Sequence, residues 1–380
     1  MEFTSTAPSS GSRQRGRKGE WRAEGWGTSR SDAWMITSME LRSTLPRKDD
    51  ELQGLTSGCI FRWPKWDIRT ELVLVGFSNH PQSETPLFFL FSLAYLANCF
   101  GNTAVITLVV LHSSLQTPMY TFLCHLAFLN IFFSTIVVPK MLHNFLATRK
   151  VISYNFCLAQ TYITLFLEVT ECFLLAVMAL DCYVAICFPL RYLLIMDTSV
   201  CVALALGAWT TGFFASVVPL FFTILPLCGP YVVDYIFCEL PILLHMFCAD
   251  TSLQEAMMLA GGAGTVLLPF LLIILSYLRI LVAVMRIDSV EGRKKAFSTC
   301  TSHLTVVTIY YGTGLIRYMR PKSLYSAEGD KLISLFYAVI NAMLNPFIYS
   351  LKNMEVKQAM GRVIGKYKNK IKSHTRMCRS

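Results

Sequence analysis

Seven long apolar runs limit the folds open to this 380-residue chain. Each run approaches or exceeds the about 20 residues that an α-helix needs to cross the hydrocarbon layer of a membrane. The chain is 54% hydrophobic and 15% charged, with a mean hydropathy of +0.48, which is too apolar for an ordinary soluble domain. We expect membrane spans at 86–111, 119–142, 157–181, 199–224, 256–284, 298–318 and 330–351.

The apolar runs predict helices rather than the strands of a barrel. Backbone N–H and C=O groups in hydrocarbon need partners within the spanning structure, so only α-helices and closed β-barrels cross a membrane. Runs such as AGTVLLPFLLIILSYLRILVAVM are too long and too evenly apolar for barrel strands, in which polar and apolar residues alternate. The predicted fold is therefore an all-α membrane protein, a bundle of seven transmembrane helices within residues 71–352.

Basic residues indicate the orientation and the domain boundaries. Lys and Arg are frequent in residues 353–380, and such residues accumulate on the cytoplasmic side of a membrane. We therefore expect a cytoplasmic C-terminus, with a short amphipathic helix and a basic tail at 353–380, and an N-terminus outside. Residues 1–70 are polar and basic (GSRQRGRKGEWRAEGWGTSR) and are expected to be a disordered extension. A solvated tail is favoured for this extension, and nucleic acid or acidic lipid are the alternative partners for its basic runs. We predict the lipid bilayer as a partner and no nucleic acid.

Four of the thirteen cysteines lie at the outer end of the third expected span or in the loop after the fourth, on the side predicted to face an oxidising compartment. Cys157 opens the third span, and Cys228, Cys238 and Cys248 lie in the loop after the fourth span. A disulfide between Cys157 and this loop would hold the loop over the mouth of the bundle. The spacing alone leaves the three possible pairings open.

Ionisable residues inside the expected spans are candidates for function, because a charge in hydrocarbon is unfavourable. The third span holds Glu168 and Glu171 on neighbouring parts of one helix face, and Asp181 lies about three turns further along. Glu168 is nearer the outer half and is the candidate for contact with a ligand. The alternative is that each carboxyl group is protonated or hydrogen-bonded to a facing helix.

Prolines and amides within the spans are consistent with a bundle whose helices can pack in two arrangements. Pro269 and Pro346 remove backbone hydrogen bonds from spans five and seven and so permit kinks. Asn102, Asn130 and Asn345 place amides at mid-membrane depth, where they can bridge helices. Static helix packing explains the same residues about as well.

Features of two other classes of membrane protein are missing from the sequence. A transporter is expected to have broken helices at matching places in two halves, but GGAG at 261–264 has no counterpart. An intramembrane enzyme needs a nucleophile and a base, or metal ligands, at one place. His303 is instead a lone histidine, for which we expect a contact on the helix surface. We predict no enzyme activity, no catalytic residue, no metal and no cofactor.

Ten short motifs follow one another along the chain. They are LVLVGFS (72–78), GN (101–102), LQTPMYTFL (115–123), PKML (139–142), DCYVAIC (181–187), PLRY (189–192), SY (276–277), KAFSTCTSHL (295–304), YYG (310–312) and NPFIYSLKN (345–353). Each motif alone is weak evidence, but together with the cysteine-rich loop they are specific. From about Glu71 to Gly365 the chain resembles an odorant (olfactory) receptor of the rhodopsin-like G-protein-coupled class.

This resemblance implies a function and a set of site residues. It implies a plasma-membrane receptor that binds a small hydrophobic, usually volatile odorant among spans three, five, six and seven. Such a receptor activates a stimulatory G protein and raises cAMP. The disulfides that it implies are Cys157 with Cys238 and Cys228 with Cys248. The ligand-binding residues that it implies are Thr164, Leu165, Glu168, Val169 and Tyr311. The residues for G-protein coupling and switching that it implies are Asp181, Cys182, Tyr183, His303, Asn345, Pro346 and Tyr349.

Three positions depart from the pattern of the family. The family reads MAYDRYVAIC where this chain reads MALDCYVAIC, so Leu180 replaces a tyrosine and Cys182 replaces the arginine that contacts the G protein. A thiol supplies neither the charge nor the fork of donors of a guanidinium group. Asn130 stands where the family usually has an aspartate, which weakens the case for a sodium ion in the bundle.

Three explanations for Cys182 stay open. The chain is a receptor with reduced coupling, or a decaying copy that folds poorly or stays silent, or a receptor in which the arginine is redundant. A non-signalling relic that keeps the fold is therefore the alternative function.

Overall fold

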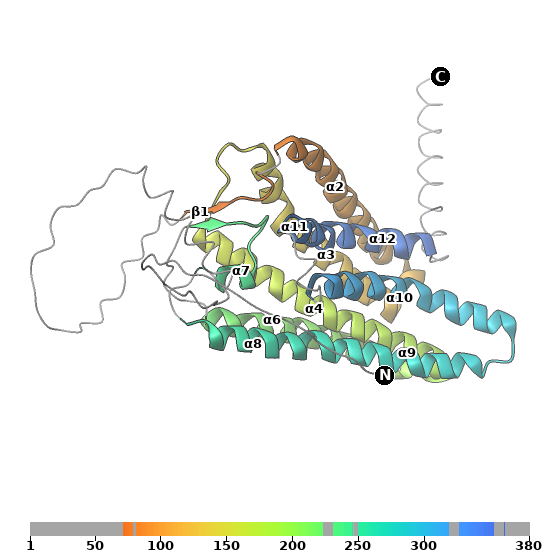
Figure 1. The fold of residues 1–380 in the computed structure, drawn as a ribbon. Helices are drawn as coiled ribbons and strands as arrows, with labels where there is room; N and C mark the ends of the chain where they lie inside the picture. The colour runs from red at the N-terminus through yellow and green to blue at the C-terminus, as the bar shows by residue number, and fades with distance from the viewer. Residues whose placement is uncertain are drawn as a thin grey trace, which may run out of the picture. The chain divides into compact units, whose positions relative to one another are not determined.

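Long α-helices packed against one another form most of the structure, a computed structural model (Figure 1). The structure describes residues 71–78, 81–222, 231–244, 246, 250–318, 327–352 and 361, which all belong to one compact unit, Trp66–Ser380. The predicted extension at 1–70 and all of the predicted tail except Gly361 lie outside these residues. Their expected structures therefore stay predictions.

The helices agree with the predicted spans to within a few residues at most of their ends. The first four spans are α2 (Pro81–Leu111), α3 (Pro118–Leu146), α4 (Tyr154–Cys187) and α6 (Thr198–Phe222). The fifth consists of α8 (Ser252–Gly262) and α9 (Leu268–Met285), which the π-helical turn Ala263–Leu267 joins. The sixth is α10 (Val290–Tyr318). The seventh consists of α11 (Ala327–Leu335) and α12 (Asn341–Lys352), which the π-helical turn Phe336–Ile340 joins. Shorter helices are α5 (Tyr192–Ile195), α7 (Leu240–Leu244) and the 3₁₀ turns Ser113–Leu115 and Pro189–Arg191.

Among the described residues, six helical segments are long and apolar enough to cross a membrane. They are Gln82–Leu111, Pro118–Leu146, Tyr154–Cys187, Thr198–Pro219, Ser252–Met285 and Gly329–Ile348. The sixth predicted span, α10, has 29 residues and is less apolar. Its length of about 43 Å exceeds the hydrocarbon thickness of about 30 Å, so its basic end at Arg293 to Lys295 can project beyond the hydrocarbon.

The fifth span widens into a π-helical turn close to its proline. Pro269 lies two residues after the end of the turn Ala263–Leu267. Proline has no N–H group for the carbonyl one turn earlier, and helices accommodate such a lost bond by local rearrangement. Pro346 lies inside α12, and the second π-helical turn ends six residues before it. Both prolines thus stand near irregular helical backbone.

The helix α4 packs against α3, α6, α9 and α10. Its contact with α6 is close because Gly212 has no side chain. A Cβ atom added to Gly212 would lie 2.1 Å from Thr170 Oγ1 and 2.9 Å from the Phe166 carbonyl oxygen. Gly101 on α2 similarly lies against Pro346, whose Cγ atom would be 3.0 Å from an added Cβ. Small residues therefore set the spacing of two helix pairs, as is usual for helices in membranes.

A three-stranded sheet covers one end of the bundle, which we call the sheet end. Its strands β1 (Glu71–Leu74), β2 (Val151–Ser153) and β3 (Val232–Val233) lie in the order β2-β1-β3. The central strand β1 is antiparallel to β2 and parallel to β3, and Val73 pairs with both Val151 and Val232. Alternate residues of β1, Leu72 and Leu74, are buried. Our sequence analysis did not predict this sheet.

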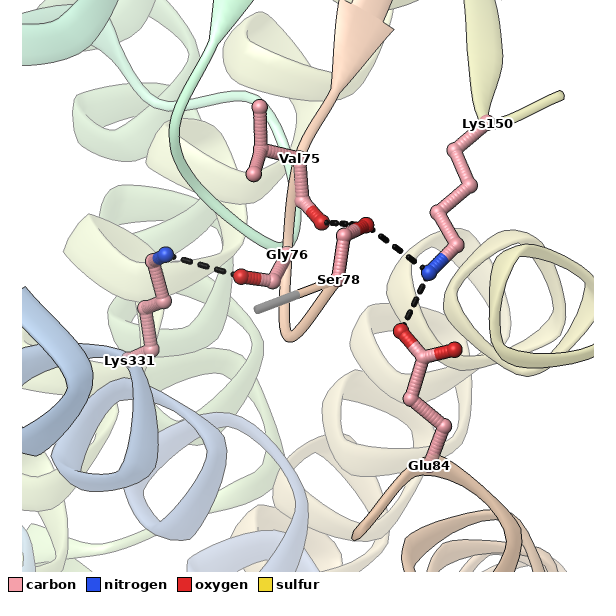
Figure 2. A network of polar contacts seen from close by, with 6 residues as sticks. All are labelled: Val75, Gly76, Ser78, Glu84, Lys150 and Lys331. Carbon is pink, nitrogen blue, oxygen red and sulfur yellow. Dashed lines mark hydrogen bonds and ion pairs between the residues drawn. The ribbon is translucent and has the colours of Figure 1, made fainter. Parts of the chain in front are cut away.

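Two lysines fasten the residues after β1 to the helices (Figure 2). The Lys331 Nζ atom of α11 donates a hydrogen bond to the Gly76 carbonyl oxygen at 2.8 Å and forms an ion pair with Asp234. The Lys150 Nζ atom donates to Ser78 Oγ at 2.9 Å and forms an ion pair with Glu84 at the start of α2. Gly76 has φ +54°, a left-handed conformation that glycine adopts without strain. The turn at Gly76 therefore directs its carbonyl group to a lysine that is far away in the sequence.

Candidate functional site

The predicted ligand-binding residues of α4 lie in the half of the helix nearer the sheet end. Thr164 and Val169 are buried, and Leu165 and Glu168 are partly exposed. The Thr164 hydroxyl donates to the Gln160 carbonyl oxygen at 2.9 Å, so its hydrogen is already used within the helix. Of these side chains, Glu168 is the one with an ionisable group.

Aromatic side chains from three other segments gather near this part of α4. The Tyr310 hydroxyl of α10 donates to the Glu168 carbonyl oxygen at 3.1 Å and lies 3.4 Å from Cys172 Sγ. The ring of Tyr311 stacks at a tilt on Phe270 of α9, with 4.8 Å between the ring centroids. The Tyr310 and Tyr337 rings are 5.6 Å apart. Spans three, five, six and seven therefore meet here, as the sequence analysis expects of the ligand site.

A small cavity lies elsewhere, at the sheet end. The residues that line this cavity include Phe77, Glu84, Met141, Asn144 and Lys150. Both polar atoms of the Asn144 amide are buried and make no hydrogen bond within the described residues. None of the predicted ligand-binding residues lines this cavity, so it is not the site that the sequence predicts.

Polar groups also meet deeper in the bundle. Glu171 interacts with Asn345 of α12, although neither Glu171 Oε1 nor the Asn345 amide atoms reach hydrogen-bond geometry. Asn98 Nδ2 donates to the Asn130 carbonyl oxygen at 3.1 Å and to Ser134 Oγ at 2.6 Å, and so links α2 to α3. Asn102 Nδ2 donates to Asn98 Oδ1 at 2.6 Å. Asn98 therefore supplies the bonds between α2 and α3. Of the amides predicted to bridge helices, Asn130 Nδ2 and both Asn345 amide atoms make no hydrogen bond among the described residues.

At the end of the bundle opposite the sheet, Asp181 accepts a hydrogen bond from a tyrosine. The Tyr192 hydroxyl at the start of α5 donates to Asp181 Oδ1 at 2.8 Å. Burial and the nearby Asp181 carboxylate raise the pKa of the Tyr192 hydroxyl above its usual range, so the phenol stays protonated and able to donate. Tyr183 is partly exposed and meets Phe188 edge to face, with 5.8 Å between the ring centroids. The sequence analysis named Asp181 and Tyr183 as site residues but gave Tyr192, the last residue of the PLRY motif, no role.

Cys182 is buried among apolar side chains at the same end. It shares a cluster with Ile280 and Val284 of α9 and Cys300 of α10. The thiol at the position of the family's arginine thus packs inward against two helices.

His303 is buried, whereas the sequence analysis expected a contact on the helix surface. Its Nδ1 atom lies 2.7 Å from the Tyr277 hydroxyl of α9, and its Nε2 atom lies 3.0 Å from the Leu175 carbonyl oxygen of α4. Only 2% of the residue is exposed. The imidazole therefore links three helices, because both of its nitrogens have partners inside the bundle. The sequence analysis included Tyr277 in the SY motif but assigned it no role.

A disulfide holds the loop after β3 against the start of α4. It joins Cys157 to Cys238, the pairing that the resemblance implies. Gln160 supports this link, because its Oε1 atom accepts the Cys238 N–H at 2.9 Å while its Nε2 atom donates to the Ile136 carbonyl oxygen at 3.0 Å. Gln160 was missed because a lone amide near a helix start is not distinctive. The predicted partners Cys228 and Cys248, and the side chain of Tyr349, lie outside the described part of the chain.

Comparison with known proteins identifies the family. A family model described as olfactory receptor matches residues 91–367. Human olfactory receptor 2A12 is 45% identical over 301 residues, which cover 79% of this chain and 97% of that protein. Mouse olfactory receptor 5G9 is 43% identical over 300 residues, which cover 79% of this chain and 96% of that protein.

A solved structure adds independent support for the fold. Squid rhodopsin superposes with a TM-score of 0.61 at 19% sequence identity, covering 76% of this chain and 87% of that one. The predicted seven-helix membrane bundle and the predicted family are thereby confirmed. The chain belongs to the olfactory receptor family.

Proposed function

We propose that this protein is a receptor for a small, volatile and largely apolar odorant, and that it activates a stimulatory G protein and so raises cAMP. The observation that carries the proposal is the identity of 45% over nearly the full length of a human olfactory receptor. We place the protein in the plasma membrane with the sheet end outside and the Cys182 end in the cytoplasm. The basic residues after the seventh span support this orientation.

The odorant is proposed to bind where α4, α9, α10 and the seventh span meet. Thr164, Leu165, Glu168 and Val169 form its α4 side, and Tyr311 lies opposite. Aromatic and aliphatic side chains stabilise a small apolar ligand mainly by burial, at about 25 cal/mol per Å² of apolar surface. A ligand of a few carbon atoms buries little area, so we expect modest affinity and broad selectivity.

Coupling is proposed to involve the opposite end of the bundle. The residues proposed for coupling at that end of α4 are Asp181, Cys182 and Tyr183. His303 belongs to α10, and the seventh span contributes Asn345, Pro346 and Tyr349. The alternative function is a receptor relic that keeps the fold without signalling. The observation that favours this alternative is the burial of Cys182 in an apolar cluster, where it offers a G protein no charge.

One experiment separates the two functions. The chain and its Cys182→Arg and Cys182→Ser forms are displayed on cells, their surface amounts are matched, and cAMP is measured against a broad odorant panel. Responses in the arginine form alone would show that the ligand site is sound and that Cys182 removes coupling. Equal responses from all three forms would make the arginine dispensable. Silence from all three, despite equal display, would contradict the receptor proposal and favour the relic.

A further inference from the structure

Two thiols from different spans meet at the end of the bundle opposite the sheet. Cys182 lies five residues before the end of α4, and Cys300 lies about three turns into α10. Their exposed fractions are 2% and 5%, and both are free thiols. They share one buried cluster. Two free cysteines in one small cluster can form a disulfide, which neither residue can do alone.

The packing of α4 on α10 supports this pairing independently. Near the sheet end, the Glu168 carbonyl oxygen accepts from Tyr310, and Cys172 contacts the same hydroxyl. Further along α4, the Leu175 carbonyl oxygen contacts His303. As α4 advances, its partners on α10 therefore move back along the sequence, which is the pattern of antiparallel helices. Further in that direction, Cys182 of α4 and Cys300 of α10 belong to one buried cluster.

We propose that Cys182 and Cys300 are a modification site, at which a hydroperoxide oxidises the two thiols to a disulfide that joins α4 to α10. With hydrogen peroxide, one sulfur attacks a peroxide oxygen, becomes a sulfenic acid and releases water. The second thiol attacks that sulfur and releases a second water. In total two S–H bonds and the O–O bond break, one S–S bond and two O–H bonds form, the two waters take up the thiol protons, and the thiols supply the two electrons. A dithiol reductant reverses the reaction, as expected on the cytoplasmic side.

The disulfide would restrict motion between spans three and six. A disulfide keeps its two Cα atoms within about 7 Å, so the ends of α4 and α10 could not separate. In the proposed receptor, oxidation would hold the bundle closed at this end and oppose coupling. This consequence rests on the proposed function, but formation of the disulfide does not.

The test detects the disulfide without using signalling. A protease site is inserted between Asp288 and Ser289, in the turn between α9 and α10, within the full chain in membranes. Cys378→Ser is included, so that Cys300 is the one cysteine after the cut. Membranes are treated with hydrogen peroxide, free thiols are alkylated, and the chain is cleaved and run on a gel without reductant. The Cys157–Cys238 disulfide lies wholly before the cut and cannot link the fragments.

We expect the two fragments to stay linked after peroxide and to separate when dithiothreitol is added. Cys182→Ser should abolish the link, whereas Cys187→Ser and Cys201→Ser, which remove neighbouring thiols, should retain it. Separation of the fragments without reductant, or a link that persists in Cys182→Ser, would overturn the proposal. Mass spectrometry of the uncut, unsubstituted chain provides a check that no substitution can disturb. It should find a disulfide-linked peptide pair containing Cys182 and Cys300, and a peroxide-treated chain without that pair would also overturn the proposal.

Discussion

The carboxyl group of Asp181 is buried and has a tyrosine as its hydrogen-bond partner. Asp181 is 2% exposed, and the adjacent residue is an uncharged cysteine that points into an apolar cluster. A hydrogen bond from Tyr192 compensates part of the loss of water around the carboxyl group. A tyrosine from the connection after α4 therefore contributes to the stability of this end of the bundle.

We expect Tyr192→Phe to lower the stability of the folded protein. The change removes one hydroxyl and leaves the buried Asp181 carboxyl without that donor, at a cost of about 1–3 kcal/mol. Thermal unfolding of the purified protein in detergent measures the effect. In the Asp181→Asn background the same change should cost less, because the amide does not carry a charge. An equal loss of stability in both backgrounds would show that the hydrogen bond between Tyr192 and Asp181 does not stabilise the protein.

We expect Glu168→Gln to alter selectivity rather than folding. Glutamine keeps the shape of glutamate and cannot carry its charge, so ligands that donate a hydrogen bond or carry a positive charge should lose potency relative to hydrocarbons of the same size. Dose–response curves across a ligand panel, at matched surface display, measure this. Glu255→Gln on the exposed face of α8 is the control for charge and should leave the order of ligands unchanged. Equal loss for every ligand in Glu168→Gln would point to a folding defect instead.

Close contacts between helices depend on glycines, which have no side chain. The α4–α6 contact brings the backbone of Gly212 against Thr170 and the Phe166 carbonyl group. The backbone oxygen cannot rotate away as a side chain can, so close approach here requires glycine. Gly207 lies on the same helix, and an added Cβ there would meet no atom within 4 Å.

These two glycines give a matched pair of substitutions. Gly212→Ala should destabilise the protein by about 1–3 kcal/mol through overpacking. Gly207→Ala should be neutral or stabilise by up to about 1 kcal/mol, because alanine favours helix more than glycine does. Unfolding temperatures in detergent measure both. A similar shift for the two variants would show that α6 is not held against α4 as the structure describes.

The molecule as a whole is tied together by contacts between distant parts of the chain. Lys331 is 1% exposed at its side chain, and it reaches the Gly76 carbonyl group across 255 residues. Its carboxylate partner Asp234 is 47% exposed and can be solvated without the lysine. The bond to Gly76 is therefore the part of this contact that water cannot readily replace.

We expect Lys331→Met to destabilise the sheet end by about 1–3 kcal/mol, because the Gly76 carbonyl loses its side-chain donor. Asp234→Asn keeps the lysine and should have a smaller effect. Hydrogen exchange of the β1 amides, together with the unfolding temperature, measures the change. Faster exchange in Asp234→Asn than in Lys331→Met would contradict this assignment.

The helices were predictable from the sequence, and most of the contacts between them were not. The thickness of hydrocarbon sets a length that apolar runs reveal directly, so both ends of α3 and the C-terminal ends of α2 and α9 agree with expectation to within a few residues. The strands have four, three and two residues, too few for a periodic pattern, and about 80 residues separate each from the next. The pairing of Cys182 with Cys300 depends on the register of α4 against α10, which no single segment encodes.

The sheet end also implies an order of assembly during synthesis. The strand β1 leaves the ribosome before every span, yet it pairs with β3, and Gly76 just after it accepts a hydrogen bond from Lys331 of the seventh span. Residues 71–74 therefore stay unpaired on one edge until β3, at residues 232–233, has been made, and the Gly76 carbonyl group waits for its donor until Lys331 follows. A chain that stops before Lys331 would leave that carbonyl group without its lysine donor.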